Sequence, residues 1–189
     1  MAVRRMPDDA PEEFLVAVSG LRAVRLRPEV QLEDVPAPQR IAPFAVALSA
    51  DVVVGGEELS TGRFVLLHDP AGPDAWEGTF RVVTFARAVL EPELGADPLL
   101  GQVGWSWLEE SLDAAGVVVR AAGGTVTRVV SESYGSLAAK APAVELEVRA
   151  SWTPVGAMGD HLVAWSMLLC TVGGLPPLPD GVAPLARRR

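Results

Sequence analysis

Residues 143–152 read AVELEVRASW, and this stretch decides the fold class of the chain. Apolar side chains alternate along it with charged or polar ones, and the apolar set is Val144, Leu146, Val148, Ala150 and Trp152. A period of two residues is typical of a β-strand, because successive side chains point to opposite faces of a sheet. The stretch therefore predicts a strand with one face in the core and one in water.

Three segments upstream carry further strand patterns. Alternation predicts a strand over 44–54 that leads into the turn Gly55-Gly56, with a helical turn near Phe44 as the alternative. Residues 63–68 are apolar on both faces, as in an interior strand. A strand over 79–90 carries apolar side chains on one face and a mixture of apolar side chains and arginines on the other.

The pair Gly123-Gly124 predicts a turn, so 117–119 and 125–134 are expected to form a hairpin. Prolines and acidic residues between Pro28 and Pro43 predict an extended surface connection. Helical periodicity and end signals indicate three helices. They are expected at 10–26 with Asp9 as the cap, between Asp97-Pro98 and Gly116, and at 161–171 after a cap at Asp160.

Strands grouped between helices, with connections of hairpin length, favour an α+β fold over a doubly wound parallel sheet. We expect a mainly antiparallel sheet of about five to six strands covered by three helices. The length of 189 residues fits a single domain, here 10–179. The ends, 1–9 and an arginine-ending tail at 180–189, are expected to be flexible, because they lack apolar periodicity.

Composition narrows the setting of the protein. Acidic residues follow Arg4 and Arg5 where a secretory signal would be apolar, and the most apolar stretch, 162–172, is shorter than the roughly 18 to 20 residues that span a bilayer. The single cysteine, Cys170, excludes an internal disulfide, so a cytoplasmic, non-membrane protein is expected. The formal net charge of −8 makes nucleic acid an unfavourable partner. Scarce lysine and isoleucine and the absence of asparagine indicate a GC-rich genome.

Motifs for catalysis, metals and cofactors are weak. The chain has no His-x-x-x-His or Cys-x-x-Cys spacing, no phosphate loop and no nucleophile elbow, so no metal and no cofactor is expected. His161 and Cys170 are nine residues apart on a predicted helix, which places them on opposite sides. His68 with Asp69 ends a strand, a position where polar residues commonly terminate strands and where active sites also occur.

Arginines on otherwise apolar strand faces are the most informative feature. Arg81 and Arg87 share a face with Phe85, while Arg128 and Glu132 share one on a later strand. Burying a charge without a partner is costly, so these arginines either pair with glutamates on neighbouring strands or line a site for an anion. In the second account Arg81, Arg87 and Arg128 line a concave site with an indole wall from Trp105 or Trp107.

Three phrases together resemble a known family. They are GRFVLLHDP at 62–70, DPLL with GWSWL between 97 and 108, and RASWTP at 149–154. The chain resembles an actinobacterial family catalogued as domain of unknown function 3000, over roughly residues 14–179. The resemblance implies no activity and transfers no catalytic residues.

These observations favour an uncharacterised non-enzymatic protein that binds a small molecule or serves as an accessory or interaction domain. Its partner would be an anionic small molecule or a protein. The alternative is an unrecognised enzyme that acts on an anionic substrate with His68-Asp69 near Arg81 and Arg128. The two hypotheses differ in whether His68 points into the same pocket as these arginines.

Overall fold

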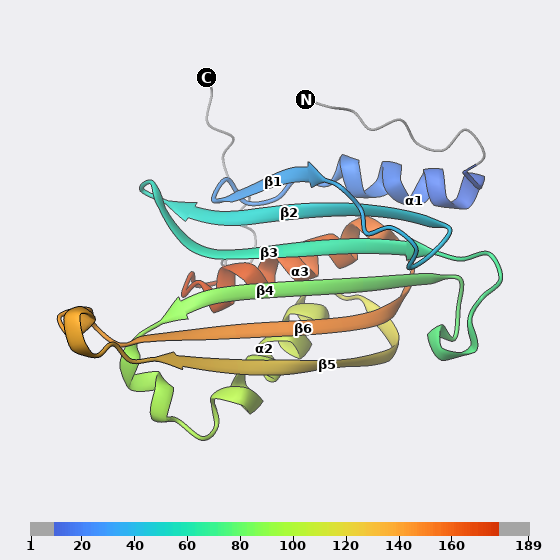
Figure 1. The fold of residues 1–189 in the computed structure, drawn as a ribbon. Helices are drawn as coiled ribbons and strands as arrows, with labels where there is room; N and C mark the ends of the chain where they lie inside the picture. The colour runs from blue at the N-terminus through green and yellow to red at the C-terminus, as the bar shows by residue number, and fades with distance from the viewer. Residues whose placement is uncertain (1–9, 178–189) are drawn as a thin grey trace.

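The fold consists of one sheet backed by helices (Figure 1). The structure is a computed structural model and describes residues 10–177. Within these residues lie three α-helices: α1 (Glu12–Ala23), α2 (Leu100–Ala114) and α3 (Met158–Val172). Six strands lie between them in two groups: β1 (Val30–Val35), β2 (Phe44–Val54), β3 (Glu57–His68) and β4 (Phe80–Leu90) before α2, and β5 (Val118–Ser131) and β6 (Ala143–Val155) after it.

All neighbouring strands of the sheet are antiparallel, in the order β1-β2-β3-β4-β6-β5. The predicted α+β class is therefore confirmed. The strand predicted over 143–152 is the core of β6, which lies between β4 and β5. The segment around Phe44 is a strand and not a helical turn.

Two local predictions were wrong. The hairpin expected around Gly123-Gly124 is instead one long strand, β5, interrupted between Arg120 and Gly123 by a bulge. The expected surface connection contains the edge strand β1. Glycine pairs and prolines mark places where a chain can turn, but tertiary pairing decides whether the turn is made, and a bulge uses the same residues as a turn.

Helix boundaries also differ from the predicted caps. Helix α1 starts after Pro11, and α3 starts after Ala157, so Asp160 lies inside the first turn of α3. Asp97 accepts a hydrogen bond from the backbone nitrogen of Leu99 at 2.8 Å, just before α2. Asp9 and the two expected flexible ends, 1–9 and 180–189, lie outside the described residues.

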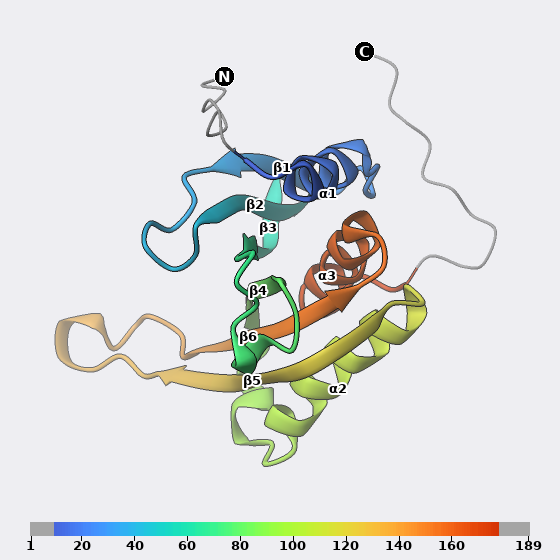
Figure 2. The same ribbon diagram turned by 90° about the vertical axis from the view of Figure 1, so that its right-hand side faces the viewer.

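All three helices lie on one side of the sheet (Figure 2). The even-numbered side chains of β4 and β6 point to these helices, and they include Val82, Ala86, Leu146 and the fully buried Trp152. Burying this apolar surface is the main favourable term for folding, at about 25 cal/mol per Å². The opposite side carries the odd-numbered residues and is called the open face below.

Helix α3 approaches the sheet closely at Gly62 of β3. A β-carbon at this position would stand 2.5 Å from the backbone oxygen of Phe85 and 2.8 Å from the Trp165 ring. The Trp165 indole nitrogen donates to the same Phe85 oxygen at 3.1 Å. The absent side chain thus makes room for a tryptophan that joins α3 to the middle of the sheet.

One end of the open face is covered by loops instead of helices. Ala47, Val65 and Leu67 are buried there in a second, smaller apolar cluster. The partly buried residues around it come from the end of β1, the β1–β2 connection, the start of β2 and the short helix before β4, and they are Val35, Ala37, Ala42, Ala45 and Trp76. The remainder of the open face has no such cover among residues 10–177.

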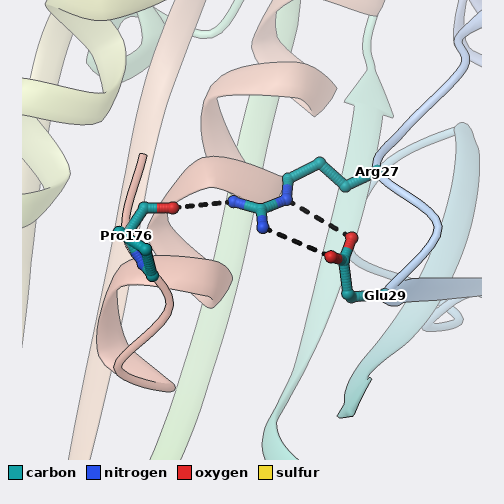
Figure 3. A network of polar contacts seen from close by, with 3 residues as sticks. All are labelled: Arg27, Glu29 and Pro176. Atoms are coloured by element: carbon teal, nitrogen blue, oxygen red, sulfur yellow. Dashed lines mark hydrogen bonds and ion pairs between the residues drawn. The ribbon is translucent and has the colours of Figure 1, made fainter. Parts of the chain in front are cut away.

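An arginine between α1 and β1 contacts the segment that follows α3 (Figure 3). Arg27 lies between α1 and β1 and donates from Nη1 to the backbone oxygen of Pro176, after α3, at 2.9 Å. It also contacts both carboxylate oxygens of Glu29 at 3.4 Å. The pKa of Glu29 is lowered mainly by a backbone hydrogen bond to its carboxylate and, to a smaller extent, by the hydrogen bond from Arg27. These contacts hold the C-terminal end of α3 against the start of β1.

Candidate ligand-binding site

The predicted arginines lie on two different faces of the sheet. Arg81 and Arg87 are on the open face of β4. Arg128 pairs in register with Leu146, whose side chain points to the helices, so Arg128 lies on the other face. The three arginines therefore do not line one concave site. The face of Arg128 follows from the register of β5 against β6, and alternation along one strand does not give the register between strands.

Arg128 and Glu132 do not pair with each other among the described residues. Arg128 donates from Nη1 to the backbone oxygen of Asp97 at 2.6 Å, and it is exposed. Glu132 accepts a hydrogen bond from the Tyr134 hydroxyl at 2.9 Å. The internal ion pair that the sequence suggested for Arg128 is thus replaced by a contact with the segment before α2.

The two tryptophans of α2 lie on the helix side of the sheet. The Trp105 indole nitrogen donates to Glu109 at 2.9 Å, and its ring lies above Gly124 of β5. Trp107 packs against the main core from the same helix. Since Arg81 and Arg87 are on the open face, neither indole forms a wall beside them.

His68 is fully buried beneath α1. Its ring stacks on Phe80 with centroids 4.3 Å apart, and its Nδ1 lies 3.1 Å from the backbone oxygen of Thr79. Nε2 lies 3.1 Å from a carboxylate oxygen of Glu13 but without hydrogen-bond alignment to any described residue. Asp69 accepts from the backbone nitrogen of Ala71. His68 points to the helix side and shares no pocket with Arg81 or Arg128.

Arg81 holds the bulge of β5 in place from two strands away. Its guanidinium donates to the Ser151 hydroxyl at 2.7 Å and to the backbone oxygen of Ala121 at 2.9 Å. Ala121 lies within the bulge and has a φ of 46°, in the left-handed region that non-glycine residues rarely adopt. Burial lowers the pKa of Arg81, and nearby Glu77 partly opposes this shift. Its hydrogen bonds are used within the protein.

Two other arginines of the open face have carboxylate partners. Arg87 pairs with Glu145 of β6 at 2.6 Å, which confirms for this residue the predicted pairing across neighbouring strands. The same contact raises the pKa of Arg87. Arg149 pairs with Glu147 of its own strand at 2.7 Å. Both positive charges are therefore balanced locally.

A hollow lies in the middle of the open face. Two adjacent rows of side chains, each crossing β3, β4, β6 and β5, form its lining. The first row is Arg63, Phe85, Arg149 and Thr125, and the second row is Val65, Val83, Ser151 and Gly123. The hollow has a volume of about 330 Å³ and is lined mainly by apolar surface. This size is at the lower end of the range for small-molecule sites.

Among the arginines that line this hollow, Arg63 has no ion-pair or hydrogen-bond partner within residues 10–177. It is exposed, and among residues 10–177 no carboxylate or carbonyl pairs with its guanidinium. On the other side of Phe85, Arg149 lies with its guanidinium 5.4 Å from the ring centre, within the range of a cation–π contact. The Phe85 ring thus lies between Arg149, which is paired with Glu147, and Arg63, which has no described ion-pair partner.

Gly123 leaves the hollow open at the β5 side. A β-carbon built at this position meets no atom within 4 Å. The next residue, Gly124, faces the helices, where a β-carbon would stand 2.1 Å from the backbone oxygen of Arg149. The two adjacent glycines therefore differ in their surroundings. Gly124 permits close packing under Trp105, while Gly123 borders free space.

Sequence reasoning missed Arg63 and Arg149 as site residues. Arg63 was read only as part of an interior strand, and Arg149 as part of a solvent-facing side. The usable signal lay within each strand, because Arg149 is on the side of its strand opposite the apolar residues and Phe85 is on the arginine-bearing side of its strand. The signal became meaningful only when the strand order β3-β4-β6 placed them on either side of Phe85.

Similarity to known proteins identifies the family. One family model matches residues 10–183. The chain belongs to the family described as Protein of unknown function (DUF3000). No curated protein and no solved structure matches the chain. Family membership confirms the resemblance drawn from the three phrases and assigns no activity.

Within residues 10–177, no group of three or more His, Cys, Asp or Glu side chains is placed to hold a metal ion. No described helix has both the length and the apolar character needed to cross a bilayer.

Proposed function

We propose that this protein is a non-enzymatic binding protein that holds an anionic small molecule in the hollow of the open face. The observation that carries the proposal is Arg63, an exposed guanidinium at the edge of an apolar hollow with no described ionic partner. A guanidinium recognises carboxylates and phosphates through two parallel hydrogen bonds. Arg63 is therefore the residue expected to contact the anion.

Charge and size support a small anion over other partners. The net charge of −8 disfavours nucleic acid, while the local charge at Arg63 is positive. A hollow of about 330 Å³ with a mainly apolar lining and one available guanidinium has the size of a small-molecule site. We therefore place a small molecule ahead of a protein as the partner.

The lining favours binding over catalysis. The hydroxyls on its side of the sheet are those of Thr125 and Ser151, and no histidine, cysteine, lysine or carboxylate lines the described hollow. A hydroxyl nucleophile needs a general base within hydrogen-bond reach. Both histidines are buried on the helix side, so the enzyme alternative with His68-Asp69 near Arg81 and Arg128 has no supporting geometry.

The proposal also includes the cellular location of the protein and the kind of genome that encodes it. A single buried cysteine agrees with a reducing, cytoplasmic location. The scarcity of lysine and isoleucine and the absence of asparagine agree with an actinobacterial genome rich in G and C.

A titration followed by amide NMR tests the proposed function. The probes are inorganic phosphate, acetate, benzoate and 2-naphthoate, added to the wild type and to Arg63→Gln. We expect at least one of them to shift the amides of Arg63, Phe85 and Arg149 in the wild type only. If none of the four moves these amides at millimolar concentration, the proposed function is wrong. Arg25→Gln makes the same charge change at an exposed site near the end of α1 and serves as the control.

A further inference from the structure

We infer that the ligand is an aromatic monocarboxylate and that Gly123 sets the length of its aromatic body. This inference rests on the proposed function and names the chemical class that the same hollow would accept. Three features carry it: the shape of the floor, the number of available cations and the space above Gly123.

The floor of the hollow favours a planar apolar body. It lies on the sheet surface, where Val83 is 38% exposed and Phe85 is half-buried beside it. Side chains on one face of a sheet project in parallel and form a broad surface. A flat ring laid on this surface buries one whole side against Val83 and the edge of Phe85, and removal of that apolar area from water is favourable.

The charges of the hollow favour a single negative group. Arg63 is available, but Arg149 is held by Glu147 at 2.7 Å and lies over Phe85. Arg81, which lies next to the hollow on β4, donates its hydrogen bonds to Ser151 and Ala121. One guanidinium matches one carboxylate in a two-bond contact, whereas a dianionic phosphate ester would lack a second cation. The carboxylate is therefore expected on Arg63, at the β3 side.

Gly123 lies at the other end of the hollow from Arg63. The register places Arg63 on β3 and Gly123 on β5, with β4 and β6 between them. Adjacent strands are about 4.8 Å apart, so a body that crosses these strands has room for two fused rings. The free space above Gly123 lets the far ring extend there, and a larger side chain would occupy that space.

Binding of 2-naphthoate, measured by calorimetry and by amide NMR, tests this inference. We expect 2-naphthoate to bind at least about tenfold more tightly than acetate or inorganic phosphate, because its rings bury apolar surface against Val83 and Phe85 that the smaller anions do not cover. The uncharged 2-naphthylmethanol should bind at least about tenfold more weakly than 2-naphthoate, because it cannot pair with Arg63.

Two variants separate the two ends of the ligand. Arg63→Gln should weaken all the carboxylates, and Gly123→Val should weaken 2-naphthoate by about tenfold or more while acetate is unchanged. Gly123 has an ordinary backbone conformation, so valine is compatible with the strand. If the valine variant does not fold, Gly123→Ala replaces it, with a smaller loss of 2-naphthoate affinity expected. Arg25→Gln should change neither ligand.

The outcomes distinguish this inference from the proposed function. If phosphate binds in an Arg63-dependent way as tightly as 2-naphthoate, the ligand class is wrong while anion binding stands. If 2-naphthoate binds but neither Gly123 variant weakens it, the role of Gly123 is wrong. If no anion binds at the hollow, the inference and the proposed function both fail.

Discussion

Trp152 of β6 donates a hydrogen bond from its indole nitrogen to Nδ1 of His161 on α3, across 3.2 Å and within the core. The other ring nitrogen, Nε2, lies 3.3 Å from the backbone oxygen of Val155, which fits a proton on that nitrogen. Both nitrogens are thus satisfied in the neutral ring. A proton added to Nδ1 would remove the acceptor that Trp152 uses, and burial lowers the pKa of His161.

The first prediction is a loss of stability in mild acid that depends on His161. In the unfolded chain its pKa is about 6.5, so below that pH the unfolded state binds more protons than the folded state and stability falls. The contribution is complete above about pH 6.5, and the slope cannot exceed about 1.4 kcal/mol per pH unit. Urea unfolding of the wild type and of His161→Gln between about pH 5 and 7 measures it.

Glutamine can accept from Trp152 and donate to Val155, yet it does not titrate in this range. The variant should therefore show a shallower dependence on pH than the wild type. His68 is present in both proteins, so it cancels in the difference. Equal slopes for the two proteins would show that His161 does not contribute.

The second prediction compares two adjacent glycines. Gly124→Ala should destabilise the fold by about 1 to 3 kcal/mol, because the new methyl group meets the Arg149 backbone and the Trp105 ring. Gly123→Ala adds the same methyl group into open space and should change stability by less than about 0.5 kcal/mol. Chemical denaturation of both variants checks this difference. A loss as large at Gly123 would contradict the assigned facing of β5.

The third prediction separates Arg81 from Arg87. Arg81→Ala leaves the Ala121 oxygen in the bulge without its donor, and we expect a loss of about 1 to 3 kcal/mol in unfolding free energy. Arg87→Ala breaks an ion pair whose arginine is 42% exposed, so about 0 to 1 kcal/mol should be lost. Thermal and urea unfolding of both variants test this order. A smaller loss at Arg81 than at Arg87 would show that the bulge does not depend on Arg81.

The fourth prediction is that Cys170 reacts slowly in the native protein. Cys170 is 4% exposed, and burial raises the pKa of its thiol, so little thiolate is present. A colourimetric disulfide reagent should label the native protein at least about tenfold more slowly than the protein in urea, because labelling requires opening of α3.

Removal of the Arg27 contacts should make that opening easier. In Arg27→Ala, Pro176 and Glu29 lose their shared partner, so the end of α3 is held less firmly and labelling of Cys170 should accelerate. Arg25→Ala removes a nearby exposed arginine and should leave the rate unchanged. Equal rates in all three proteins would show that Arg27 does not restrain this end.

Local patterns were enough to predict the fold class. Alternation in β6 and in β4 identified each strand and its two faces, because the side-chain period of a strand is a property of the backbone alone. The same reasoning assigned Arg81 and Arg87 to one face of β4. It could not give the facing of β5 relative to β4, because that facing depends on the register with β6 and on a bulge with one extra residue between Arg120 and Gly123.

The sequence by itself determined an acidic α+β protein with one cysteine, the two faces of β4 and β6, and a resemblance to its family. Only the tertiary structure decided that Arg63 and Arg149 flank Phe85, because their strands are neighbours through pairing between segments far apart in the chain. Strand order also decided which arginines form an ion pair with a carboxylate on a neighbouring strand, as Arg87 does with Glu145. Such pairings depend on which apolar faces the helices cover, and that choice is made by the packed core as a whole and not by any one segment.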